Sequence, residues 1–161
     1  MTLNRSILII LVLAFASCSK FSKVLKSKDF EYKLKMANTY FDKKEFRKSQ
    51  VLYEELFPVF KGTPQFDDLY YKYAYSHYNL RDYITAENLF KGYLEVFSNS
   101  VRAEEVEYMQ SFCYYKQSPK AELEQTNTIK AIGMLQIFIN THPESSKVKE
   151  AEALIAKCQA K

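Results

Sequence analysis

Three kinds of side chain in this sequence could do chemistry: thiols, imidazoles and closely spaced carboxylates. The thiol with the most informative surroundings is Cys18, which follows the small residues Ala16 and Ser17 and an apolar run over residues 7–16. This run is half as long as the ~20 apolar residues that a transmembrane helix needs. A short lead that carries Arg5, an apolar core and small residues before a break are typical of a secretory signal peptide. The pattern therefore predicts export from the cytosol, with a cysteine at the cleavage point.

The same stretch resembles the lipobox of bacterial lipoproteins, whose cysteine is acylated and becomes the mature N-terminus. Phe15 stands where that motif usually has leucine. The resemblance implies a lipoprotein signal peptide over residues 1–17, then a lipidated Cys18 and a basic linker over residues 18–28. Several acyl chains would hold the protein stably, whereas one chain binds a membrane only marginally. An ordinary signal peptide with an incidental cysteine is the alternative.

The other cysteines and both histidines give little support for redox or metal chemistry. Cys113 and Cys158 fall in helical patterns of different predicted hairpins, which favours two buried thiols over a disulfide. His77 and His142 are far apart, and neither has a partner at metal-ligand spacing. We expect no metal and no cofactor.

Carboxylates occur in pairs at Glu54-Glu55 and Glu104-Glu105, with Glu107 close to the second pair. Acid–base catalysis needs carboxylates that converge in a cleft, and sequence neighbours on a helix point apart. We interpret these residues as solvated helix faces. No Ser-His-Asp or Cys-His set can be assembled, so the sequence predicts that the protein is not an enzyme. A catalytic envelope protein is the alternative class.

Composition predicts one folded unit that does not bind nucleic acid. Without residues 1–17 the chain has 144 residues, which is enough for a single core. Its 22 basic and 19 acidic residues give a net charge of +3, interpreted as spread along the sequence, whereas nucleic-acid binding needs a concentrated basic face. The 3 glycines leave no phosphate-binding loop and few hairpin turns, which favours helices.

Two segments that begin at Met36 and Tyr73 repeat each other with a period of 37 residues. When the two segments are aligned in this register, small residues match small residues and aromatic residues match aromatic residues. The matched pairs are Ala37 with Ala74, Tyr40 with His77, Phe46 with Tyr83, Ser49 with Ala86, and Tyr53 with Phe90. The order is similar to the tetratricopeptide pattern, in which small residues permit close helix approach and aromatic residues fill the gaps. Such periods indicate stacked helical hairpins.

Helical periodicity agrees with this repeat. It predicts helices over 29–42 and 46–57, from Thr63-Pro64 to a turn at Arg81-Asp82, and over 83–97 and 101–116. A further predicted helix begins at residue 128 and stops at Pro143, and a last one covers 146–161. The third hairpin contains an insertion of about eight residues, and the last helix is a lone terminal one. We expect an all-α fold, a right-handed superhelix of about three and a half tetratricopeptide-like hairpins over residues 29–161.

The cysteine motif, the basic linker and the hairpins together resemble the N-terminal part of the BamD family, lipoproteins of the outer-membrane β-barrel assembly (BAM) complex. The segments that carry this resemblance are YFDKKEFRKSQVLYEELFPVFKGT, DDLYYKYAYSHYNLRDYITAENLFKGYLEVFSNS, EVEYMQSFCYYKQSP and AIGMLQIFINTHPES. They cover most of the mature chain. That family usually has further C-terminal hairpins, which have no counterpart in this sequence.

The resemblance implies a lipid-anchored adaptor on the periplasmic face of the bacterial outer membrane. The implied partners are periplasmic domains of the β-barrel insertase, other lipoproteins of the complex, and unfolded segments of outer-membrane proteins. In that family the N-terminal repeats receive unfolded substrate, so the resemblance favours substrate reception. A general envelope scaffold that recruits cell-wall or division enzymes is the alternative function.

The first helix of each hairpin is expected to line a concave groove, on which residues seven apart share one stripe. The predicted partner-binding residues are Leu34, Asn38, Phe41, Tyr71, Tyr75, Tyr78, Tyr108, Phe112 and Tyr115. Tyrosine and phenylalanine offer a large contact area at low rotamer cost, which suits capture of an extended apolar peptide. Packing between hairpins is the alternative interpretation for several of these rings.

Overall fold

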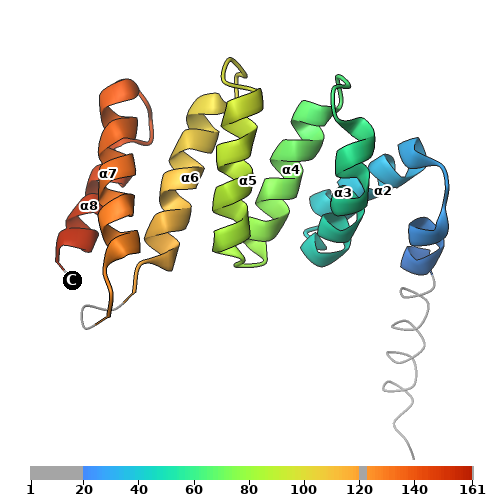
Figure 1. The fold of residues 1–161 in the computed structure, drawn as a ribbon, viewed down its shortest axis with the longest axis horizontal. Helices are drawn as coiled ribbons and strands as arrows, with labels where there is room; N and C mark the ends of the chain where they lie inside the picture. Colours follow the sequence, from blue (N-terminus) through green and yellow to red (C-terminus); the bar gives the residue numbers. More distant parts are fainter. Residues whose placement is uncertain (1–19, 120–122, 161) are drawn as a thin grey trace, which may run out of the picture.

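The computed structural model describes residues 20–119 and 123–160, and this part of the chain is helical throughout, apart from its turns and loops. Residues 20–26 are helical. The longer helices are α2 (Phe30–Asp42), α3 (Phe46–Phe60), α4 (Phe66–Asn79), α5 (Tyr83–Val96), α6 (Ala103–Gln117), α7 (Thr126–Thr141) and α8 (Val148–Gln159). They stand side by side in one row, with residues 20–26 at one end and α8 at the other (Figure 1). The prediction of an all-α fold of tetratricopeptide-like hairpins is confirmed.

Each helix packs mainly against the next helix in the chain, so that α2–α3, α4–α5 and α6–α7 form hairpins. Among the first helices, α2 contacts α4 and α6 contacts α8, whereas the backbones of α4 and α6 do not approach as closely. No comparable contact joins the second helices α3, α5 and α7 within the described part of the chain. The first helices therefore lie on the tighter side of the row, which is where a solenoid presents its binding surface.

The repeat of 37 residues is visible in the backbone. Lys44 and Arg81, which are 37 residues apart, both adopt left-handed conformations, with φ of 60° and 64°. In both hairpins the next amide N–H closes the turn, from Glu45 to the Tyr40 carbonyl at 2.8 Å and from Asp82 to the His77 carbonyl at 3.0 Å. The same turn therefore sets the angle of the first two hairpins.

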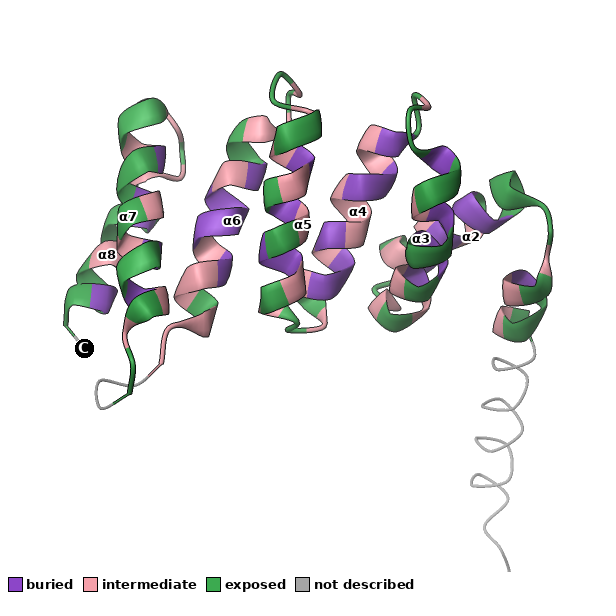
Figure 2. Ribbon diagram, in the orientation of Figure 1, coloured by how far each residue is buried: buried purple, intermediate pink, exposed green. Residues whose placement is uncertain are grey.

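Small residues lie where the helices approach most closely. Ala37, Ala74 and Ala86 have no exposed surface, and the hydroxyls of Ser49 on α3 and Ser76 on α4 lie 3.0 Å apart. Buried residues recur along every helix (Figure 2). The large side chains that fill the gaps include Tyr53, Leu56, Phe90, Tyr93, Leu135 and Phe138. Burial of one such large side chain contributes about 1.5–3 kcal/mol of hydrophobic free energy. The core therefore consists of the small and large apolar residues that the repeat pattern predicted.

Asp29 caps α2 by accepting a hydrogen bond from the Tyr32 N–H at 2.9 Å, and Asp82 caps α5 in the same way. The predicted helix start at Thr63-Pro64 is wrong, because α4 begins at Phe66. The Thr63 hydroxyl donates to the Phe60 carbonyl at 2.7 Å instead of accepting an N–H from the next helix. Thr63 therefore closes the end of α3.

Cys113 and Cys158 are both buried and no disulfide joins them, as the sequence predicted. Cys113 has no exposed surface, and burial together with the Glu87 carboxylate raises its pKa to about 12.

One buried charge was not foreseen: the Lys33 side chain of α2 is 2% exposed and forms an ion pair with Glu55 of α3. This pair ties the two helices of the first hairpin together.

Candidate partner-binding surface

A continuous series of aromatic rings crosses from α4 to α6. We call it the ring ladder; its members are Tyr71, Tyr75, Tyr78, Phe112 and Tyr115. Successive ring centroids lie 4.6, 6.2, 6.2 and 5.6 Å apart. These distances are typical of attractive aromatic pairs. All five side chains are half-buried, so each ring rests on the core and keeps part of its surface accessible.

Glu105 of α6 holds one end of the ladder. Its Oε1 accepts hydrogen bonds from the hydroxyl of Tyr71, at 2.9 Å, and from that of Tyr75. Burial and these bonds to the carboxylate raise the pKa of Tyr71 to about 12, and they raise the pKa of Tyr75 as well. Both rings therefore stay uncharged at any physiological pH.

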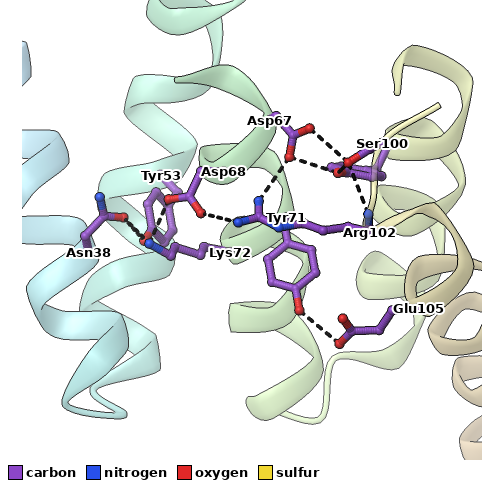
Figure 3. A network of polar contacts seen from close by, with 10 residues as sticks. Asn38, Tyr53, Asp67, Asp68, Tyr71, Lys72, Ser100, Arg102 and Glu105 are labelled. Carbon is purple, nitrogen blue, oxygen red and sulfur yellow. Dashed lines mark hydrogen bonds and ion pairs between the residues drawn. The ribbon is translucent and has the colours of Figure 1, made fainter. Parts of the chain in front are cut away.

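Arg102, directly before α6, binds the first turn of α4 with both of its terminal nitrogens (Figure 3). One lies 3.0 Å from Asp67 Oδ1 and the other 2.9 Å from Asp68 Oδ1. The Tyr93 hydroxyl and the Ser100 hydroxyl also reach the Asp67 carboxylate, at 2.9 and 3.1 Å. This cluster fixes the position of α6 relative to α4 and thereby aligns the two halves of the ring ladder.

Asn38 lies beyond the ladder, on α2, and its side chain is already engaged. The Tyr53 hydroxyl donates to its Oδ1 at 2.7 Å, and the Lys72 ammonium lies 3.3 Å from the same atom (Figure 3). Lys72 also pairs with Asp68 at 2.7 Å, so the polar contacts run on from α2 to the Arg102 cluster. Asn38 therefore links hairpins, and its role in binding a partner remains a prediction.

The prediction of an accessible position is wrong for Leu34 and Tyr108. Leu34 is 8% exposed within the core, and Tyr108 is 2% exposed with its ring 5.5 Å from that of Phe138 on α7. Tyr71 occupies the matching repeat position yet is half-buried, with the Arg102 guanidinium over its ring. Phe41 is half-buried, but its ring contacts Phe46 and Tyr53, within the first hairpin and apart from the ladder.

Sequence reasoning also missed the surroundings of His142. Its Nε2 lies 2.8 Å from Glu107 Oε2 and its Nδ1 lies 4.0 Å from Glu104 Oε2. The Ser145 hydroxyl donates to Glu104, not to the imidazole, so no nucleophile is aligned with a base. The contacts of His142 with Glu104 and Glu107 connect α6 to the end of α7. Along residues 20–119 and 123–160, no set of three or more His, Cys, Asp or Glu side chains has an arrangement suited to a metal ion.

The family model for YfiO, described as an outer membrane lipoprotein, matches residues 28–161. The chain belongs to this family. The YfiO match spans all seven helices from α2 to α8, so the ring ladder and the Arg102 cluster both lie within it. No individual curated protein matched the chain.

Membership in the YfiO family assigns this protein to the outer membrane as a lipoprotein. Nowhere in residues 20–119 and 123–160 is there a helix with the length and apolar character to cross a bilayer. Cys18, the residue predicted to carry the lipid, lies outside the described residues, so its acylation remains a prediction.

Proposed function

We propose that the protein is a lipid-anchored adaptor on the periplasmic face of the outer membrane, and that it serves the BAM complex. In this role the ring ladder receives extended segments of unfolded outer-membrane proteins or of partner domains. The insertase and the other lipoproteins of the complex are the expected partners. Membership in the outer membrane lipoprotein family supports the location, and the stacked hairpins support a role in binding polypeptides.

The observation that carries this proposal is the half-buried state of the five ladder rings. Rings fixed by neighbouring rings lose little conformational entropy when a ligand binds, and their faces bury a large apolar area. The tyrosine hydroxyls keep such a surface wettable in the absence of a ligand. A β-strand of an outer-membrane protein alternates apolar and polar side chains, and it matches a surface that offers both ring faces and hydroxyls.

Charged groups flank the ladder on both sides. The Glu105 carboxylate lies at its α4 end, and the Lys116 ammonium lies 4.9 Å from the ring centroid of Phe112. Such a rim adds specificity more than affinity, because exposed charges are screened by salt. The surface therefore suits a mainly apolar segment with a few polar side chains.

The test is affinity capture from detergent-solubilised envelopes with the full lipidated chain. The variant is Tyr78→Ala/Phe112→Ala/Tyr115→Ala, and the matched control removes three exposed side chains of the second helices, Ile84→Ala/Ile129→Ala/Ile137→Ala. These isoleucines are 66, 68 and 64% exposed. Circular dichroism checks that both variants are folded.

We expect the unaltered chain and the control to enrich the β-barrel insertase and unfolded barrel proteins, and the ladder variant to lose at least the unfolded proteins. A synthetic strand peptide with alternating apolar residues and a C-terminal phenylalanine should bind in the same order. Enrichment of cell-wall or division enzymes without the insertase would refute this function and favour the general scaffold.

A further inference from the structure

Positive charge is concentrated at the end of the row opposite α8. Residues 20–48 contain ten basic and four acidic side chains, a net charge of +6, whereas residues 49–161 contain twelve basic and fifteen acidic ones, a net charge of −3. The interpretation of an evenly spread charge is therefore wrong. The average over the chain concealed an asymmetry between its two parts.

Several of these lysines line one cavity. It has a volume of about 540 Å³ and lies between residues 20–26 and the first hairpin. Its charged lining groups are Lys20, Lys23, Lys43, Lys48 and Glu45, which give a net charge of +3. Lys48 pairs with Glu45, whereas the other three lysines have no carboxylate partner within the described part of the chain.

A hydroxyl group adds to the lining of this basic cavity. Tyr32 and Thr39 of α2 contribute to its wall beside the lysines, and because the Thr39 hydroxyl donates to the Lys35 carbonyl at 2.8 Å, the Tyr32 hydroxyl is the one that can donate to a ligand. Ammonium groups and hydroxyls together are the groups that bind phosphate oxygens. A volume of about 540 Å³ is in the range of cavities that hold small ligands, so a phosphorylated headgroup fits.

An apolar cavity of about 610 Å³ adjoins the basic one and shares Glu45 and Lys48 with it. Its apolar wall consists of Phe21, Phe46, Val51 and Leu80. Phe21 also packs edge to face on Tyr40, at 5.6 Å between ring centroids, which holds residues 20–26 against the first hairpin beside both cavities. A basic cavity next to an apolar one has the polarity of a phospholipid, which carries a charged headgroup on apolar chains.

We propose that this end of the protein binds an anionic membrane phospholipid, with the phosphate among Lys20, Lys23 and Lys43 and an acyl chain against Phe21 and Phe46. The site is placed for this ligand, because Lys20 comes only two residues after the predicted lipid-bearing cysteine. Basic side chains next to a lipid anchor are attracted to anionic headgroups. A nucleic acid would have no use for the adjoining apolar wall.

This second attachment would fix the orientation of the row of helices at the membrane. A flexible tether alone restrains distance but not direction. A headgroup bound at one end brings the first hairpin to the bilayer surface and leaves α8 farthest from it, because these elements stand at opposite ends of the row (Figure 1). The site is separate from the ring ladder on α4 and α6.

The experiment uses the purified lipidated chain in vesicles of phosphatidylcholine alone or with added phosphatidylglycerol. A water-soluble amine reagent modifies exposed lysines briefly, and mass spectrometry measures the extent at each residue. We expect Lys20, Lys23 and Lys43 to react about fivefold more slowly in the anionic vesicles, which is the effect of one lysine held near an anionic surface. Lys61, Lys91 and Lys149 serve as internal controls and should react equally in both.

Two triple variants, each of which removes three positive charges, complete the design. In the unaltered chain the neighbouring Lys26 and Lys28 should also react more slowly in the anionic vesicles. Lys20→Gln/Lys23→Gln/Lys43→Gln should abolish this protection of Lys26 and Lys28, whereas Lys61→Gln/Lys91→Gln/Lys149→Gln should retain it. Equal reactivity in the two kinds of vesicle, or equal protection of the control lysines, would overturn the proposal. Protection by soluble glycerol phosphate without any effect of the vesicles would assign the cavity to a free phosphate ester and would also overturn it. No protein partner is present, so the outcome is independent of the proposed function.

Discussion

The guanidinium carbon of Arg102 lies 4.5 Å from the ring centroid of Tyr71, and the same side chain binds Asp67 and Asp68. One residue thus covers a ring of the ladder and holds two carboxylates of α4. A planar guanidinium can stack face to face on a ring while its two terminal nitrogens bind separate carboxylates, a geometry that the single nitrogen of an ammonium does not offer. Arg102 therefore determines both the spacing of two hairpins and the exposure of a predicted binding residue.

Replacement of Arg102 should destabilise the protein in proportion to the number of its contacts, with the Tyr71 ring and the Asp67 and Asp68 carboxylates, that the new side chain cannot make. The groups involved are each about a third exposed, so we expect Arg102→Ala to lower the free energy of unfolding by about 1–2 kcal/mol. Arg102→Lys should cost less, because the charge remains while the stacking and one carboxylate contact are lost. Urea denaturation followed by circular dichroism measures both. Equal stability of Arg102→Ala and the unaltered chain would show that the cluster contributes nothing.

Stability should fall at alkaline pH because burial raises the pKa of several tyrosines, among them the half-buried Tyr71 and Tyr73. Burial, chiefly, raises the pKa of Tyr71 and of Tyr73 to about 12, against about 10 in an unfolded chain. Between pH 10 and 12 the unfolded state has therefore lost protons that the folded state keeps, so the free energy of unfolding decreases as pH rises and is unaffected by these groups below pH 10. Tyr73→Phe should make the decline shallower in urea titrations across this range. Parallel curves for the two proteins would contradict the assignment.

The thiol of Cys113 should be chemically inert in the folded protein. It has no exposed surface, and its pKa of about 12 leaves almost no thiolate at neutral pH. Iodoacetamide should therefore modify it only as fast as the protein unfolds, and rapidly in denaturant. Mass spectrometry after timed exposure gives the rate. Fast modification under native conditions would mean that α6 opens locally.

Two helical glycines should respond in opposite ways to alanine. A Cβ at Gly92 would lie 2.2 Å from the Tyr70 hydroxyl oxygen, whereas nothing lies within 4 Å of one at Gly133. We expect Gly92→Ala to lower the free energy of unfolding by about 1–3 kcal/mol through overpacking. Gly133→Ala should raise it by about 0.5–1 kcal/mol, since alanine loses less backbone entropy in a helix. Thermal and urea unfolding of the pair provide the comparison, and a shared sign would be the unexpected result.

The mature protein should begin with an acylated Cys18. Mass spectrometry of the N-terminal peptide should find the cysteine with its lipids, and Cys18→Ala should either remain unprocessed or leave the membrane fraction. An unmodified N-terminus on either side of residue 18 would remove the tether from the model of function.

The sequence predicted the repeat because the small and aromatic residues that define it are buried by residues of the adjacent helices, which recur at a fixed spacing along the chain. Ala37, Ala74 and Tyr53 lie in the core as the 37-residue register requires. The same register could not predict the exposure of Leu34, Tyr71 and Tyr108, which share one repeat position. Their surroundings differ because the covering group comes from another part of the chain in each case.

The polar contacts were likewise out of reach of sequence patterns. Arg102 lies 34 residues after Asp68, and only the stacking of hairpins brings the guanidinium to the carboxylate. His142 meets Glu107 in the same way, across 35 residues.

The bridges between α4 and α6 consist of long side chains: Arg102 to Asp67 and Asp68, Glu105 to Tyr71 and Tyr75, and Tyr78 to Phe112. The two hairpins are also joined by the close packing of α5 on α6, which is at least as extensive as the packing inside either hairpin. A strand that competed for the Tyr71 and Tyr75 hydroxyls would therefore release Glu105 without separating the hairpins. Occupancy of the surface would exchange side-chain contacts locally while the backbone of the row keeps its curvature.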